Sequence, residues 1–391
     1  MSNPKDTLPV SIQDASVPLA RWAVLAMFFA NGALLANWLA RIPQIQANLA
    51  LSEGELGLAL MGMAVGVLTA LTMAGGLIAR FGSRAVTTGG GVLLCLLLPF
   101  LGLMPNMIGL WITLFLFGAA MSTMDVAMNA QGVDVERLLK RSVMSSFHAA
   151  FSIGGFVGAA IGAGMAFLGV GPALHFVLAG ALFLLFIVLI SPRLLPVAPK
   201  IEPGMTESVF QLPARALWPL GAVAFCSSIG EGAMADWSGV YLKTIVGTVD
   251  GVAAFGFAAF SITMTIGRLL GDNLAMRFGA ANLVRAGGLC AAVGLLLAII
   301  LPQVAVVLLG FAAVGAGLSI VVPLAFSAAG NIPNLPSGVG IAGVATIGYA
   351  GFLAGPPAIG LLAEATTLRV AMLLVLLLVS SLIFTAQALR Q

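Results

Sequence analysis

The chain has 391 residues, of which 60% are hydrophobic and only 8% are charged, with a formal net charge of +3. A water-soluble protein is about 45–50% apolar and about 25% charged, so this composition excludes a cytosolic enzyme, a nucleic-acid-binding protein and a disordered chain. The apolar residues run in blocks of about 20, which is typical of membrane-spanning helices and not of the alternating strands of a β-barrel.

The first twenty residues are polar and contain Pro4, Pro9 and Pro18. They lack the short apolar core of a signal peptide, and the block that follows is long enough to span a membrane. We therefore expect that block to be a retained first helix.

Cutting the chain at charged and turn-forming residues predicts an all-α membrane protein with twelve spans, each long enough at about 1.5 Å per residue to cross a core of about 30 Å. The predicted spans are residues 21–42, 54–79, 85–104, 107–131, 144–168, 172–191, 216–243, 252–272, 281–301, 304–329, 338–363 and 367–389. The longest polar break is rich in proline. It predicts an N-terminal six-helix half (1–191), a cytoplasmic linker (192–215) and a C-terminal six-helix half (216–391).

Lysine and arginine are enriched in the cytoplasmic loops of membrane proteins. In the twelve-span arrangement most of these residues fall on one side, and only Arg41, Lys243 and Arg369 fall near the other. This bias predicts a multi-pass protein with both termini in the cytoplasm.

The two halves share an internal repeat at an offset of 197 residues. Residues 80–82 (Arg-Phe-Gly) align with 277–279, and residues 118–119 (Gly-Ala) align with 315–316, without a gap. An even number of spans in each half makes the repeats parallel, so the two six-helix bundles are expected to be pseudo-symmetric about an axis along the membrane normal.

Two parallel six-helix halves joined by a long loop resemble the major facilitator superfamily of transporters. Residues 75–84 (GGLIARFGSR) are similar to that family's signature G-x-x-x-D-R-x-G-R-R, with departures at Ala79 and Ser83. Three segments resemble the bacterial branch near the fucose permeases, which includes the YbjJ-like inner-membrane transporters. They are residues 125–136 (DVAMNAQGVDVE), 145–155 (SSFHAAFSIGG) and 351–360 (GFLAGPPAIG). The resemblance implies the major facilitator fold, a bacterial inner (plasma) membrane and a sugar-like solute. It also implies that spans 1, 4, 7 and 10 line a central cavity and that spans 3, 6, 9 and 12 face lipid.

Asp125 is the most informative charged residue inside a predicted span. It shares one face of the fourth span with Ser122 and Asn129, and its counterpart in the repeat is Val322. A charge at the bilayer centre costs about 2.5–3.5 kcal/mol, so it usually lines a cavity or has a partner. We predict that Asp125 takes up and releases a proton and that Ser122 and Asn129 bind solute. The alternative is that Asp125 is a permanently paired packing residue.

Two further residues are predicted to take part in proton coupling. Glu231 lies near the middle of the seventh span and has no acidic counterpart in the first half; its alternative role is a buried ion pair. His148 opens the fifth span at a depth similar to that of Asp125, and it either relays protons or hydrogen-bonds to the fourth span.

Solute binding is also predicted for Asn31, Ser228 and Tyr349. Asn31 in the first span can hydrogen-bond a hydroxylated solute or hold helices together. Ser228 lies on the same side of the seventh span as Glu231, and Tyr349 in the eleventh span can stack on a sugar ring.

Gating is predicted for five charged residues. Arg80 and Arg84 belong to the signature loop, and Asp236 lies near the opposite end of the seventh span, where its alternative is a solvated helix end. Arg268 and Asp272 in the eighth span are four residues apart, so they are expected to pair with each other or across the cytoplasmic gate.

No enzyme activity, cofactor, metal or nucleic-acid partner is expected. The three cysteines lie inside apolar blocks, and no hydrolase, P-loop or metalloprotease motif is found. Residues 338–343 match G-x-G-x-x-G, but no strand precedes them, so the match has no dinucleotide-binding context.

The sequence therefore predicts a proton-coupled symporter of a small polar, sugar-like solute that works by alternating access. Its expected partners are the solute, protons and the lipid bilayer, and it is expected to be a monomer. The alternative is a proton-driven efflux antiporter for a metabolite or drug. Efflux antiporters of the superfamily carry a Gly-Pro pair in the fifth span, where this chain has Gly158-Ala159, and this departure favours symport. A membrane enzyme or receptor is the alternative of a different class.

Overall fold

A computed structural model describes residues 16–140, 143–196, 215–332 and 337–390. These residues form helices joined by short turns, and they contain no strand. The predicted linker of residues 192–215 lies largely outside the described residues.

Each half of the chain supplies six long helical segments. The N-terminal half contains α1 (Ser16–Leu39), α2 (Ile42–Leu49), α3 (Glu53–Phe81), α4 (Ser83–Leu101), α5 (Met107–Leu139), α6 (Met144–Phe167), α7 (Pro172–Ile190) and η1 (Ser191–Arg193). The C-terminal half contains η2 (Arg215–Leu217), α8 (Trp218–Thr244), α9 (Asp250–Ala253), α10 (Phe255–Phe278), α11 (Ala280–Ile300), α12 (Val304–Leu318), α13 (Val321–Gly330), α14 (Ser337–Ala365), α15 (Leu368–Thr385) and η3 (Ala386–Arg390).

The predicted spans coincide with these helices, except that residues 304–329 are divided between α12 and α13. Within the described residues, eleven helical segments are long and apolar enough to cross a membrane. The long helix outside that set is α8, which carries Glu231, Asp236 and Lys243 and packs against α14 and α15. A helix with this many charges is stable among other helices because its polar side chains do not face lipid.

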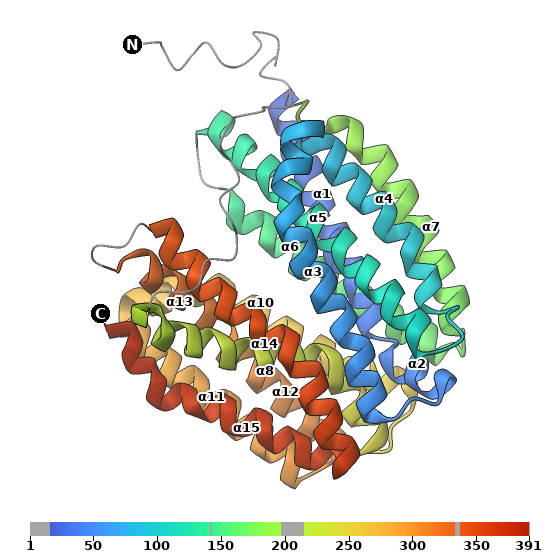
Figure 1. Cartoon of the computed structure of the whole chain (residues 1–391), viewed down its shortest axis with the longest axis vertical. Coiled ribbons are helices and arrows are strands. Elements are labelled where there is room, and N and C mark those ends of the chain that lie inside the picture. Colours follow the sequence, from blue (N-terminus) through green and yellow to red (C-terminus); the bar gives the residue numbers. More distant parts are fainter. Residues whose placement is uncertain (1–15, 141–142, 197–214, 333–336, 391) are drawn as a thin grey trace.

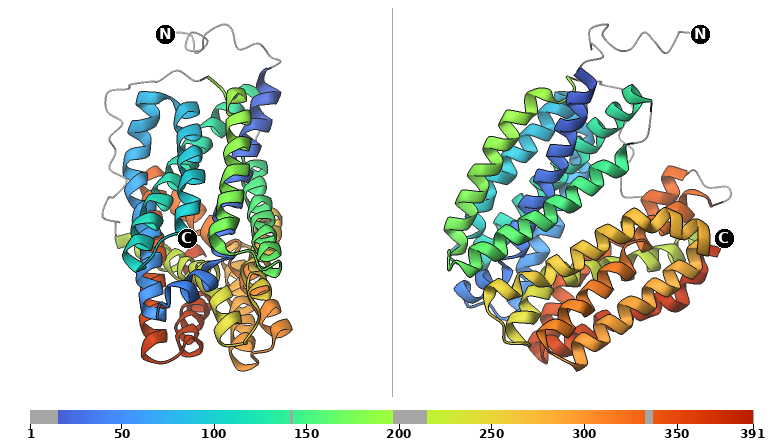
Figure 2. Two further views of the ribbon diagram at one scale, coloured as in Figure 1. Left: turned by 90° about the vertical axis from the view of Figure 1, so that its right-hand side faces the viewer. Right: turned by 180° about the vertical axis from the view of Figure 1, so that it is seen from behind.

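The two halves form separate bundles that meet at one end and diverge at the other (Figures 1 and 2). The diverging end is the one at which α1 begins and η3 ends, and we call it the terminal side. The meeting end carries α2 and α9, and we call it the far side. Helix α3 contacts α14 across the halves, and α6 contacts α9 and α10.

The turns after α3 and α10 confirm the internal repeat. Gly82 and Gly279, which are 197 residues apart, both have a φ of 79° and end one helix while preceding the next. This left-handed conformation favours glycine because a side chain would clash with the backbone. The guanidinium of Arg80 lies 5.2 Å from the centre of the Phe81 ring, and Arg277 lies 5.3 Å from that of Phe278. The same turn is therefore built twice.

One predicted helix is broken. Residues 304–329 were expected to form one helical span. Residues 304–330 do make up one candidate membrane span, but its helix is interrupted, since α12 ends at Leu318 and α13 begins at Val321. The cause is Pro323, whose ring clashes with the carbonyl four residues earlier, that of Ser319, and which has no N–H to donate to it. The equivalent position in the first half is Val126, and α5 runs without a break. The prediction of one continuous helix was wrong here, and the break frees a carbonyl beside the cavity described below.

The helices that correspond to spans 3, 6, 9 and 12 lie on the outside of the bundles. Their exposed surfaces are apolar and include Leu93, Leu96 and Phe100 of α4, Leu182, Leu185 and Leu189 of α7, Leu289 and Leu296 of α11, and Leu373 and Leu377 of α15. Exposing such a surface to water would cost free energy, whereas contact with the hydrocarbon of a bilayer would not.

Candidate functional site

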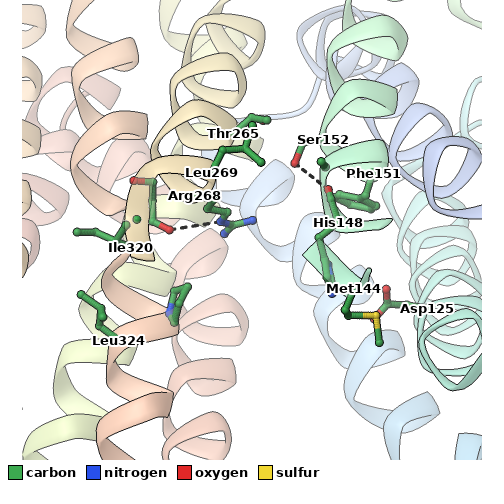
Figure 3. A pocket seen from close by; sticks show the side chains of 14 residues that line it. Asp125, Met144, His148, Phe151, Ser152, Thr265, Arg268, Leu269, Ile320 and Leu324 are labelled. Carbon is green, nitrogen blue, oxygen red and sulfur yellow. Dashed lines mark hydrogen bonds between the residues drawn. The ribbon is translucent and has the colours of Figure 1, made fainter. Parts of the chain in front are cut away.

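A cavity of about 470 Å³ lies between the two halves (Figure 3). Its lining includes Asp125 of α5, Met144, His148 and Ser152 of α6, Thr265 and Arg268 of α10, and Ser319, Ile320, Pro323 and Leu324 at the α12–α13 break. A second cavity of about 610 Å³ extends from it between α8, α13 and α14, and shares His148, Arg268 and Pro323 with the first. The second cavity adds Ser228, Glu231 and Tyr349 to the lining.

Asp125 contributes a carboxylate to the wall formed by the N-terminal half. Asn129, one turn later on α5, donates through Nδ2 to the Asp125 carbonyl at 2.8 Å and to its Oδ1 at 3.3 Å. Among the described residues, no cationic group lies within 4 Å of the Asp125 carboxylate. Asp125 therefore faces the cavity with one neutral hydrogen-bond donor as its partner.

His148 stands on the same wall, on α6. Its ring packs edge-on against Phe28 with the two centres 5.3 Å apart, and the Ser152 hydroxyl donates to the His148 carbonyl at 3.2 Å. Because His148 lines both cavities, it lies where they join. The structure brings it to the same cavity as Asp125.

The opposite wall carries an ion pair. Arg268 Nη2 lies 3.3 Å from Glu231 Oε2, and the Ser227 hydroxyl donates to Glu231 Oε1 at 3.2 Å. Arg268 Nε donates at 3.4 Å to the carbonyl of Ser319, the one that Pro323 leaves without its helical partner.

The structure gives Arg268 a partner that the sequence did not assign to it. A local (i, i+4) pair with Asp272, or a pair across the gate, was predicted, and in the described residues the guanidinium bonds Glu231 of α8. The reason is tertiary packing, since α10 lies against α8 and Arg268 points into the cavity between the halves. The side chain of Asp272 lies outside the described residues.

The other predicted residues fall into two groups. Ser228 and Tyr349 line the second cavity. Asn31 and Ser122 are buried and line neither of the two cavities. Asn31 Nδ2 donates to the Met121 carbonyl at 3.4 Å and so joins α1 to α5. In this conformation Asn31 serves a helix contact.

Three other predicted gating residues, Arg80, Arg84 and Asp236, do not line these two cavities. Arg80 stacks on Phe81 at the terminal side, and Arg84 lies in the first turn of α4. Asp236 is half-buried in α8, and in the described part of the chain its carboxylate makes no hydrogen bond or ion pair.

Polar contacts close the far side, and sequence reasoning did not find them. Gln44 Nε2 donates to Asp250 Oδ2 at 2.6 Å, and the Ser52 hydroxyl donates to Glu364 Oε2 at 3.0 Å, each joining one half to the other. Lys243 pairs with Asp250 within the C-terminal half. Ser52 also caps α3 by accepting from the backbone N–H of Glu55 at 3.2 Å.

A buried polar cluster lies near this closure, within the N-terminal half. His175 Nε2 and Asn37 Oδ1 are 2.8 Å apart, and the Arg41 guanidinium donates to the carbonyls of Gly162 and Val170. Burial lowers the pKa of Arg41 to about 10, and the nearby Asp250 carboxylate opposes that shift, so Arg41 stays charged at neutral pH. The spacing of Asn37 and Arg41 is visible in the sequence, but the partners of both residues are distant along the chain.

A polar cavity enclosed between two pseudo-symmetric six-helix bundles is the architecture of a membrane transporter. The chain belongs to the Major Facilitator Superfamily, whose family model matches residues 22–335.

Relatives of this chain carry transporter names. It is 38% identical over 361 residues to an uncharacterized MFS-type transporter of Yersinia pestis, covering 92% of this chain and 93% of that one. It is 35% identical over 378 residues to the uncharacterized transporter y4wD of Sinorhizobium fredii, covering 95% and 99%. A solved mutant of the nucleoside transporter NupG superimposes with a TM-score of 0.81 at 10% identity, covering 95% of this chain and all of that chain (100%), which shows the shared fold.

Proposed function

We propose that this protein is a proton-coupled symporter of a small polar, hydroxylated solute. The observation that carries the proposal is the arrangement of charge across the cavity. Asp125 on one half has no cationic partner among the described residues, and the other half presents the Glu231–Arg268 pair. Unpaired carboxylates are costly in a low-dielectric cavity, so protonation of Asp125 removes that cost and allows the loaded carrier to change conformation.

The solute is held between the walls in this proposal. Ser228 and Tyr349 of the second cavity supply a hydroxyl and an aromatic ring, and Asn129 supports Asp125. Hydroxyl groups and an aromatic face suit a sugar-like solute, as in the bacterial branch that the motifs resemble.

The membrane orientation follows from the basic residues. Arg80, Arg84, Arg277 and Lys140 lie at the terminal side of their helices, and basic residues favour the cytoplasm. The terminal side would then face the cytoplasm of a bacterium, and the structure would be the inward-open state of a monomeric carrier.

Replacing Asp125 by asparagine tests the proposal. Purified protein is first screened by thermal shift against sugars, polyols and sugar acids, and the solute that stabilises it is used in proteoliposomes with an inward proton gradient of two pH units. Coupling to one proton allows about tenfold accumulation per pH unit, so the wild type should approach about 100-fold. The Asp125→Asn variant should equilibrate the solute without concentrating it, because the amide does not titrate.

Asp134→Asn is the matched control for this experiment. Asp134 lies on the same helix outside the cavity lining, where one of its contacts is with Arg137 at 3.5 Å. It should accumulate solute like the wild type. Equal accumulation by Asp125→Asn would refute the role of Asp125, and outward pumping would show the antiporter instead.

A further inference from the structure

The guanidinium of Arg268 is hydrogen-bonded through two of its three nitrogens. Nε donates to the Ser319 carbonyl at 3.4 Å and Nη2 to Glu231 Oε2 at 3.3 Å, while Nη1 has no acceptor among the residues that the structure describes. The side chain is 43% exposed and that of Glu231 only 14%. Figure 3 shows Arg268 extending from α10 toward the wall that carries His148 and Asp125.

The fold holds both hydrogen-bond acceptors of Arg268, the Ser319 carbonyl and the Glu231 carboxylate, in place. Pro323 breaks the helix and leaves the Ser319 carbonyl available, and the Ser227 hydroxyl holds the second oxygen of Glu231 at 3.2 Å. The guanidinium is thereby placed at the junction of the two cavities with its free edge toward the space where a solute would sit.

We propose that Arg268 binds a carboxylate group of the transported solute, and that Glu231 is the internal competitor which a proton displaces. This inference rests on the proposed symport and narrows its solute to an acid, such as a sugar acid. Guanidinium groups bind carboxylates best through two parallel N–H···O bonds, and such pairs are about twice as strong as neutral hydrogen bonds. The single contact of 3.3 Å to Glu231 leaves that two-pronged geometry unused.

Charge balance links this site to the proton. The groups facing Glu231 are Arg268 from α10, His148 from α6, Tyr349 from α14 and, across the cavity, Asp125 from α5. With both acids ionised and His148 and Tyr349 neutral, these described groups carry one net negative charge, so they would repel an anionic solute. A proton on Glu231 removes one negative charge and releases Arg268 at the same time. The solute and the proton should therefore bind together.

A permanent ion pair that only joins α8 to α10 would behave differently. Such a pair would bind no anion, and replacing either Glu231 or Arg268 would destabilise the fold. The experiment below separates these two roles by measuring ligand preference and not stability alone.

The test uses the full-length purified protein and matched neutral and acid probes, namely glucose with glucuronate and glycerol with glycerate. Dissociation constants are measured from ligand-dependent thermal shifts at pH 6 and pH 8. At least one acid should bind the wild type about tenfold or more tightly than its neutral partner at pH 6, and more weakly at pH 8. Arg268→Gln should lose this preference, Arg268→Lys should keep part of it, and Arg277→Gln on the same helix should not change it.

Glu231→Gln gives the most direct readout of the competition. At pH 8 this variant should bind the acid about tenfold more tightly than the wild type, because the amide no longer competes as an anion for Arg268. Equal binding of every acid and its neutral partner, or no gain in Glu231→Gln, would overturn the inference. If a neutral sugar binds and is accumulated with protons, the symport proposal stands and this inference fails. If acids bind at Arg268 but are not accumulated with protons, the inference stands and the symport proposal fails.

Discussion

Replacing Gly57 by valine is expected to open the far side of the transporter and to hold it open. Helices α3 and α14 meet there backbone to backbone. A Cβ atom at Gly57 would lie 2.5 Å from the Pro356 carbonyl oxygen and 3.1 Å from Gly360 Cα, closer than backbone atoms can tolerate. Neither neighbour can move away as a flexible side chain would. The clash should therefore separate the halves and break the nearby Ser52–Glu364 hydrogen bond.

Distances between spin labels measure this opening directly. In a background without the three native cysteines, labels at Ala47 on α2 and Thr366 after α14 report the separation of the halves at the far side. The Gly57→Val variant should shift the distribution to longer distances and lose transport. Gly75→Val is the control, because it lies on the same helix with nothing within 4 Å of its Cβ position. An unchanged distribution in Gly57→Val would show that this contact does not control closure.

Replacing Gly154 by leucine is expected to destabilise the N-terminal half severely. Helices α1 and α6 approach so closely that a Cβ at Gly154 would overlap the Phe29 carbonyl, and Gly158 and Gly32 stand in the same relation to Ala33 and Phe151. Overpacking a tight contact costs about 1–3 kcal/mol or more. Because a whole leucine side chain must be accommodated against backbone, we expect the upper end, and a fall in Tm on the order of 10 °C.

Gly164→Leu provides the comparison for that experiment. Gly164 lies on the same helix, and nothing lies within 4 Å of its Cβ position, so its Tm should stay near that of the wild type. Thermal unfolding of the purified proteins, followed by intrinsic fluorescence, measures both. Similar Tm values for the two variants would mean that α1 and α6 can separate without cost.

The architecture could be predicted from the sequence because lipid imposes a simple rule on length and polarity. Gly82 and Gly279, which the repeat aligns, adopt the same φ of 79° in the structure because both halves build the same turn. The break between α12 and α13 was missed because both pieces are apolar and add up to one span. Pro323 was the visible signal, and applying its effect on Ser319 would have located the break.

The sequence identified individual residues of the site but not the contacts between them. Asp125 and Glu231 stood out because charge is rare inside the spans, and the structure places both at the same pair of cavities. Their surroundings depend on packing between distant segments. Local spacing suggested Asp272, whose side chain lies outside the described residues, as the partner of Arg268, and the contact that the structure describes is with Glu231, 37 residues away. The His175–Asn37 bond joins residues 138 positions apart, and no periodic pattern indicates it.

The central claim is that solute and proton move together through the cavity beside Asp125. Proteoliposomes loaded with the pH indicator pyranine test it most directly, with equal pH on both sides and the stabilising solute added outside. The wild type should acidify the lumen as solute enters, and Asp125→Asn should carry solute without a pH change. A lumen that becomes alkaline, or acidification that persists in Asp125→Asn, would contradict the claim.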